Sequence, residues 1–193
     1  IRGAGLVFGY KQSGVVSRVG VEYYNTLLKD ALNKKTNKPK RITTPSLVFW
    51  GKSLIPRNYI SSDTDRFSFY SKIHNAKKEE VFNDIKNELR DRFGKIPKET
   101  MSFIKLAELS NLYRKTLVVD IIIEQESLLF KLPKKLVFDV EQIISKILSY
   151  KSSFVLEKKF KEETKSISVI FSTERDYDWY SELISCNSLF YKT

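Results

Sequence analysis

Glycine and apolar positions divide the first 45 residues into three stretches. Five of the seven glycines lie within residues 1–20, which predicts a loop with tight turns. Between residues 21 and 32 the apolar side chains of Tyr24, Leu27, Leu28 and Ala31 recur at helical spacing, which predicts an amphipathic helix. Residues 34–45 are polar and basic and end in Thr-Thr-Pro, which is typical of a linker. The pattern therefore predicts a boundary at residue 45.

A helical region is predicted next, after a short strand over residues 46–50. Ser62 is placed to cap a helix over residues 63–74. A second helix over residues 79–93 has Gly94 just past its end, and a third begins near Pro97 and runs to about residue 115. The apolar side chains expected to be buried in these two helices are Val81, Phe82, Ile85, Leu89 and Phe93, and Met101, Ile104, Leu106, Leu109 and Leu112.

The periodicity changes after residue 116. Strands are predicted over residues 117–123 and 128–132, joined by a hairpin, and over 154–160 and 166–172. Helices are predicted between and after these strands, over residues 139–150 and 176–185. This order predicts an α+β fold over residues 46–193, with a helical region followed by a small, mostly antiparallel sheet and packed helices.

The charge balance adds a candidate partner. The formal net charge is +11, and the densest basic stretch consists of Lys34, Lys35, Lys38, Lys40 and Arg41. Such a stretch could contact nucleic acid through its phosphates. The alternative is a lysine-rich surface that binds nothing of the kind.

The cysteine content and the apolar runs of the chain indicate its cellular compartment. Cys186 is the single cysteine and cannot form an internal disulfide, which favours the reducing cytoplasm. No apolar run reaches the roughly 20 residues that span a bilayer, and the first residues do not resemble a signal peptide. Because the chain begins with Ile1, we expect it to be a piece of a longer protein.

Enzymatic motifs are incomplete. Gly51-Lys52-Ser53 ends like a phosphate-binding loop, but Ser46 stands where that loop needs its first glycine. His74 is the one histidine and is expected at a helix end. We therefore predict no catalytic residues, no metal site and no cofactor in this piece.

Two polar clusters remain as candidate sites. Arg2 and Gln12 lie beside glycines, where they could contact a phosphate or a backbone, or belong to a structural turn. Glu88, Asp91 and Arg92 share one helix face, which we expect to lie opposite the apolar side. That face is either an interaction surface or an ordinary solvated one.

A family resemblance connects these clusters. Residues 1–5, Gly9 and residues 12–14 resemble the motif that follows the second motor lobe of RecG-type DNA translocases. Further motifs resemble the C-terminal domain of bacterial transcription-repair coupling factors. They are Leu54-Ile55-Pro56, Tyr59-Ile60, Arg66, Phe69-Tyr70, Glu88-Leu89, Asp91-Arg92-Phe93-Gly94 and Pro97.

The resemblance implies a function for each cluster. In that family the whole protein is an ATP-driven translocase on double-stranded DNA that displaces stalled RNA polymerase and recruits UvrA. ATP and Mg²⁺ belong to its motor. The motif with Arg2, Gly3, Gly5 and Gln12 would couple hydrolysis to movement, and residues 21–32 would form a hook-like helix. Glu88, Asp91 and Arg92 would clamp the N-terminal UvrB-like module and hide its UvrA-binding surface.

This sequence departs from the family in its glycine loop, where Val7, Tyr10 and Lys11 replace acidic residues, and in the more apolar strand at residues 47–50. Two alternatives therefore stay open. One is a basic nucleic-acid-binding module, and the other is the tail of a RecG-like helicase.

Overall fold

The computed structural model describes residues 44–133, 140–162 and 166–191. The predicted glycine loop, the helix over residues 21–32 and the basic stretch lie outside these residues. Within the described residues, no helix is long and apolar enough to cross a membrane.

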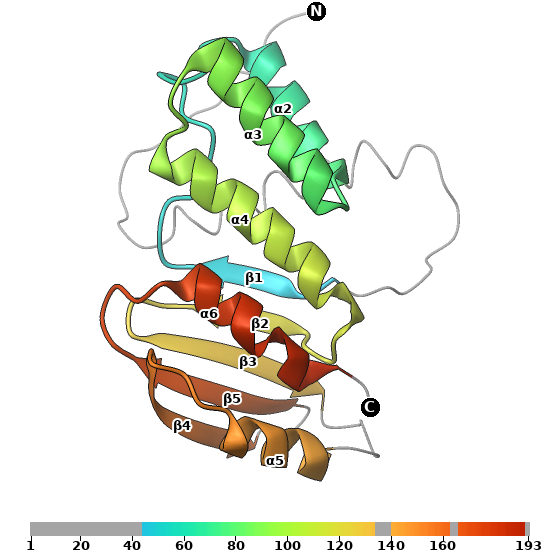
Figure 1. The fold of residues 1–193 in the computed structure, drawn as a ribbon, viewed down its shortest axis with the longest axis vertical. Helices are drawn as coiled ribbons and strands as arrows, with labels where there is room; N and C mark the ends of the chain where they lie inside the picture. The colour runs from blue at the N-terminus through green and yellow to red at the C-terminus, as the bar shows by residue number, and fades with distance from the viewer. Residues whose placement is uncertain (1–43, 134–139, 163–165, 192–193) are drawn as a thin grey trace, which may run out of the picture.

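A five-stranded sheet forms the lower half of the molecule (Figure 1). Its strands are β1 (Ser46–Phe49), β2 (Asp120–Ile123), β3 (Ser127–Pro133), β4 (Val155–Glu162) and β5 (Ser166–Thr173). Their order across the sheet is β1-β2-β3-β5-β4. The β1–β2 pair is parallel, and every other pair is antiparallel. The prediction of a mostly antiparallel sheet in an α+β fold is therefore confirmed.

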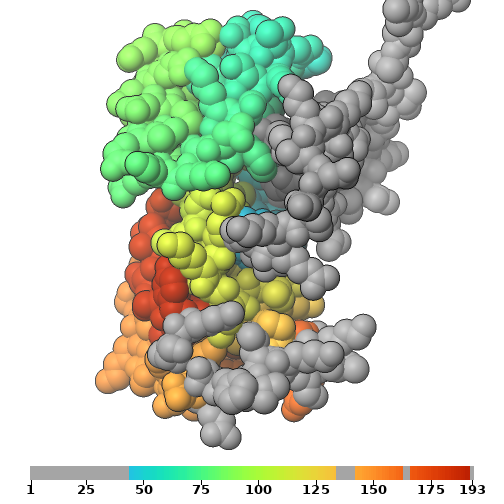
Figure 2. Space-filling model, turned by 90° about the vertical axis from the view of Figure 1, so that its right-hand side faces the viewer, coloured from blue at the N-terminus to red at the C-terminus, as the bar shows by residue number. Residues whose placement is uncertain are grey.

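Three helices form the upper half, α2 (Asp63–Asn75), α3 (Glu79–Phe93) and α4 (Lys98–Leu112). Two more, α5 (Val140–Ser149) and α6 (Trp179–Cys186), lie in front of the sheet in Figure 1. Short 3-10 turns follow α4 and α6, at Tyr113–Lys115 and Asn187–Phe190. In Figure 2 the green mass of α2 and α3 lies above α4, which is yellow-green.

The buried side chains form two separate clusters. The first joins α2, α3 and the start of α4, and we call these elements the helical lobe. The second lies between the sheet, α5 and α6, which we call the sheet lobe. Helix α4 contributes to both, with Phe103 and Ile104 in the first cluster and Leu106 and Leu109 in the second, and Tyr113 of the following 3-10 turn also lies in the second.

Local chemistry explains where the helices of the helical lobe begin and end. The Ser62 hydroxyl accepts a hydrogen bond from the backbone amide of Asp65 at 3.1 Å, which caps α2 as predicted. Gly94 follows the last residue of α3 with φ of 80°, a conformation that other residues rarely adopt. His74 is the last residue but one of α2, as expected of a helix-end histidine.

Candidate functional site

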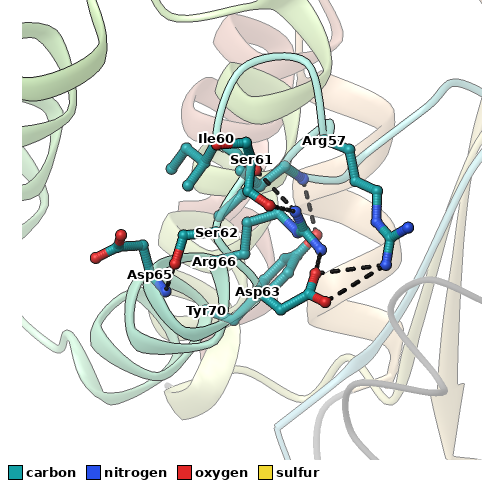
Figure 3. Close-up of polar contacts among 9 residues, drawn as sticks. Arg57, Ile60, Ser61, Ser62, Asp63, Asp65, Arg66 and Tyr70 are labelled. Carbon is teal, nitrogen blue, oxygen red and sulfur yellow. Dashed lines mark hydrogen bonds and ion pairs between the residues drawn. The ribbon is translucent and has the colours of Figure 1, made fainter.

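The loop that precedes α2 is fixed to that helix by Arg66 (Figure 3). Its guanidinium donates hydrogen bonds to the carbonyl oxygens of Ile60, at 2.7 Å, and Ser61, at 3.1 Å. The same group pairs with Asp63, which also faces Arg57 at 3.4 Å. These contacts hold the first turn of α2, which carries Asp65, in a defined position.

Tyr70 fixes the same loop farther back. Its hydroxyl accepts a hydrogen bond from the backbone amide of Ile55 at 2.8 Å, and its ring packs edge-on against Phe103 of α4. These contacts join the loop, α2 and α4 to one another without involving α3.

Helix α3 meets α2 through a chain of four charged side chains. Lys72 of α2 donates to both carboxylate oxygens of Glu88, at 2.7 and 2.6 Å. Arg92, one turn farther along α3, donates to Glu88 at 3.2 Å and to Asp65 of α2 at 2.9 Å. Their side chains are 34–44% exposed, so the chain lies at the protein surface.

Aromatic rings lie beneath these charges. The Arg92 guanidinium carbon lies 4.9 Å from the ring centre of Phe93 and 5.5 Å from that of Phe69. The Lys72 ammonium lies 5.0 Å from the Phe69 ring. Cations over aromatic faces are attracted by the ring quadrupole, which further restricts these two side chains.

The contacts favour the charged forms of the acids. The hydrogen bond from Lys72 holds the pKa of Glu88 below its ordinary value, and Arg92 adds to this effect. The hydrogen bond from Arg92 likewise lowers the pKa of Asp65. At neutral pH the site is therefore a set of ionised, mutually paired groups.

Asp91 differs from its two neighbours. Its side chain is exposed, and no other described residue pairs with it through a hydrogen bond or an ion pair. It continues a stripe of exposed polar residues at helical spacing, formed with Glu80, Asp84 and Asn87. Asp91 is therefore available to an outside partner.

The expectation that all three residues lie opposite the apolar side of α3 is wrong for Glu88 and Arg92. These two side chains flank the buried face of Ile85 and Leu89 and reach α2. The reason is that α2 packs beside α3, and long charged side chains at the margin of that contact turn towards it. Only Asp91 keeps the predicted outward position.

The partners of this site could not be found in the sequence. Asp65 lies 27 residues before Arg92, and Lys72 lies 16 residues before Glu88. No spacing rule within one helix connects residues so far apart. The i and i+4 spacing of Glu88 and Arg92 was the one signal, and it predicted their mutual contact.

The remaining candidate sites are the incomplete phosphate-binding loop, the two N-terminal clusters and a metal site. Gly51-Lys52-Ser53 leads from β1 into a loop, and the next helix begins only at Asp63, so no helix N-terminus faces this segment as a phosphate-binding loop requires. Arg2, Gly3, Gly5 and Gln12, and the basic residues from Lys34 to Arg41, lie outside the described residues. Within the described part of the chain, no group of three or more acidic, histidine or cysteine side chains could hold a metal ion.

Comparisons with known proteins identify the class of the fold. Residues 51–143 match the family model of the TRCF domain. The fold matches the crystal structure of a C-terminal domain of transcription-repair coupling factor with a TM-score of 0.62. That match has 20% sequence identity and covers 76% of this chain and 91% of the other. The chain thus contains an α+β domain of the TRCF class.

Similar full-length proteins identify the family. The transcription-repair-coupling factor of Borreliella burgdorferi is 29% identical over 184 residues, which cover 89% of this chain and 16% of that protein. The Escherichia coli protein of the same name is 35% identical over 115 residues, 56% of this chain and 10% of that protein. The chain therefore contains the TRCF domain and is similar to a C-terminal region of the transcription-repair coupling factors. It spans less than a fifth of the length of these two relatives.

Proposed function

We propose that this chain is the regulatory C-terminal piece of a cytoplasmic transcription-repair coupling factor, and that α3 carries its regulatory surface. In the resting protein, Glu88, Asp91 and Arg92 contact the N-terminal UvrB-like module of the same protein. This contact hides the UvrA-binding surface of that module until the protein engages stalled RNA polymerase. The piece itself binds and regulates, and catalyses nothing.

The observation that carries this proposal is the position of Asp91. It is an exposed carboxylate beside two charged residues that α2 already holds in place. A partner that meets Asp91 therefore does not have to order Glu88 and Arg92, which lowers the entropic cost of binding. A polar contact of this kind also suits a surface that must open again, because it remains stable in water when the partner leaves.

The parent protein supplies the motor in this proposal. It hydrolyses ATP with Mg²⁺ and moves on double-stranded DNA, and Arg2, Gly3, Gly5 and Gln12 transmit hydrolysis to movement. Substituting Arg2 or Gln12 with alanine is then expected to leave ATP hydrolysis in place while displacement of RNA polymerase falls. A proportional loss of both activities would contradict this role.

A titration of UvrA against the parent protein tests the clamp. Substituting Glu88, Asp91 and Arg92 together with alanine is expected to let UvrA bind without polymerase. Each tenfold gain in affinity corresponds to about 1.4 kcal/mol of lost closed-state bias. Asp91→Lys is expected to act in the same direction, because it reverses the outward charge.

Asp84→Lys is the matched control for Asp91→Lys. Asp84 is an exposed carboxylate on the same stripe of α3, two turns before Asp91. We expect Asp84→Lys to change UvrA affinity far less. Equal UvrA affinities for the wild-type, the triple variant and Asp91→Lys, with all proteins folded, would reject the proposal.

A further inference from the structure

Glu108 of α4 joins three helices. One of its carboxylate oxygens accepts a hydrogen bond from the Lys86 ammonium of α3 at 2.5 Å. The other accepts from the Tyr180 hydroxyl of α6 at 2.6 Å. The Lys86 and Glu108 side chains are only 18% and 13% exposed, so this pair is better shielded from water than the surface pairs of α2 and α3. Through Glu108, the helix with the candidate site is connected to the sheet lobe.

Tyr180 is a firm anchor because α6 is held tightly on the sheet lobe. The buried Tyr113 hydroxyl donates to the carbonyl oxygen of Leu183 at 2.7 Å. The buried carboxylate of Glu182 accepts from Tyr150 at 3.0 Å and Ser152 at 2.5 Å. The ring of Tyr180 is itself covered by the Lys105 ammonium, 4.6 Å from its centre.

The two apolar clusters connect α3 to the sheet lobe only indirectly, through α4. The buried residues of α3 pack within the helical lobe and none of them belongs to the cluster of the sheet lobe. Apolar packing is tolerant of small rotations, whereas a hydrogen bond weakens steeply when its angle changes. Lys86 is fixed by two such bonds in series, and Arg92 lies six residues farther along the same helix.

We propose that Tyr180 is a positioning residue for α3. Through Glu108 and Lys86 it sets the rotation of α3 against the sheet lobe, and so it tunes the affinity of the α3 surface for its partner. This inference rests on the proposed function, because it assigns that surface a control point in α6. A change in the sheet lobe that moves α6 then alters the clamp without touching Glu88, Asp91 or Arg92.

Amide hydrogen exchange of the 193-residue chain tests the positioning step. Tyr180→Phe removes only the hydroxyl and its hydrogen bond to Glu108. Because hydrogen bonds to charged groups are strong, the exchange rate of the α3 amides should rise about three- to tenfold. Tyr177→Phe is the matched control, because its hydroxyl donates to the carbonyl oxygen of Ser127 within the sheet lobe. It should leave the α3 amides unchanged. Unchanged α3 exchange in Tyr180→Phe, or an equal rise in β3 and β5, would overturn the inference.

UvrA affinity of the parent protein tests the consequence. Tyr180→Phe is expected to raise the affinity for UvrA about three- to tenfold in the absence of polymerase. Adding Lys86→Met should change the binding free energy by less than the sum of the two single changes, because both substitutions act through Glu108. If the triple alanine variant of the clamp raises UvrA affinity but Tyr180→Phe does not, Tyr180 does not tune the clamp and the inference fails. If neither variant changes UvrA affinity, the proposed function fails, and the exchange data alone decide whether Tyr180 positions α3.

Discussion

Arg92 reaches across the helix pair to Asp65, with 2.9 Å between the guanidinium Nη2 and the carboxylate Oδ1. This contact joins the last turn of α3 to the first turn of α2. It separates the three residues proposed to form the clamp, Glu88, Asp91 and Arg92, into two kinds. Arg92 and Glu88 pair with side chains of α2 and help to hold the two helices together, whereas Asp91 points outwards and pairs with no other described residue.

A stability comparison of single alanine variants tests this division. Arg92→Ala is expected to lower the melting temperature of the chain, because it removes the pairs with Asp65 and Glu88 and the cover over Phe93. Asp91→Ala should leave the melting temperature unchanged, since no other described residue pairs with it and surface substitutions usually have small effects. Equal losses in the two variants would show that the paired geometry does not contribute to stability.

Stability should also depend on acidity through Glu88. Its pKa is held below the ordinary value of 4.5, chiefly by the hydrogen bond from Lys72. The folded carboxyl therefore stays ionised at a pH where the unfolded one is already protonated. The contribution to stability is complete above pH 4.5 and is lost as the pH falls through the lower folded pKa.

Urea unfolding between about pH 6 and pH 3 measures this effect. Glu88→Gln should reduce the fall in stability with acid, and Glu80→Gln serves as the control because its exposed carboxyl pairs with no other described residue. An acid dependence that Glu88→Gln leaves unaltered would exclude Glu88 as a contributor.

Gly94 is expected to resist substitution. Its φ is 80°, and no atom lies within 4 Å of the place where a Cβ would be, so alanine meets backbone strain without a clash. Gly94→Ala should cost about 1–2 kcal/mol in the free energy of unfolding. Lys95→Ala, at the next exposed position, should cost less than about 0.5 kcal/mol. Equal values from thermal or urea unfolding would contradict the strained conformation.

Cys186 should be unreactive in the folded chain. Burial raises the pKa of its thiol to about 12, and the side chain has no exposed surface. The thiolate that reacts with alkylating reagents is therefore scarce at about pH 8, and the reagent cannot reach it. Iodoacetamide is expected to label Cys186 only after unfolding. In Ser185→Cys, an exposed position on the same helix, the new thiol should be labelled at once, and equal labelling of both would refute the burial of Cys186.

Helix ends were predictable because their signals are local. Ser62 and Gly94 act on their immediate neighbours, and the predicted span of α3, residues 79–93, matches the structure. Burial was less predictable. Val81 was expected in the core but is 39% exposed, because no described neighbour packs over that side of α3.

Helix α4 shows the same limit in another form. Phe103 is buried although the pattern did not select it, while Met101 and Leu112 are only partly buried. The pattern assumed one apolar face, but α4 packs against two clusters on different sides. The pairing of the strands could not be predicted from the sequence either, because the parallel β1–β2 pair joins segments more than 70 residues apart. The candidate site shared this difficulty, because Asp65 and Lys72 reach it only through packing.

The double role of α4 has a thermodynamic consequence. Phe103 and Ile104 lie in one cluster, and Leu106 and Leu109 lie in the other, on the same continuous helix. Melting either cluster removes the packing that supports half of α4, and a helix this short has little stability of its own in water. The two lobes therefore lose their structure together, and heat should produce one cooperative transition. Far-ultraviolet circular dichroism, which follows the helices, and tryptophan fluorescence, to which Trp179 of the sheet lobe contributes, should share a single midpoint.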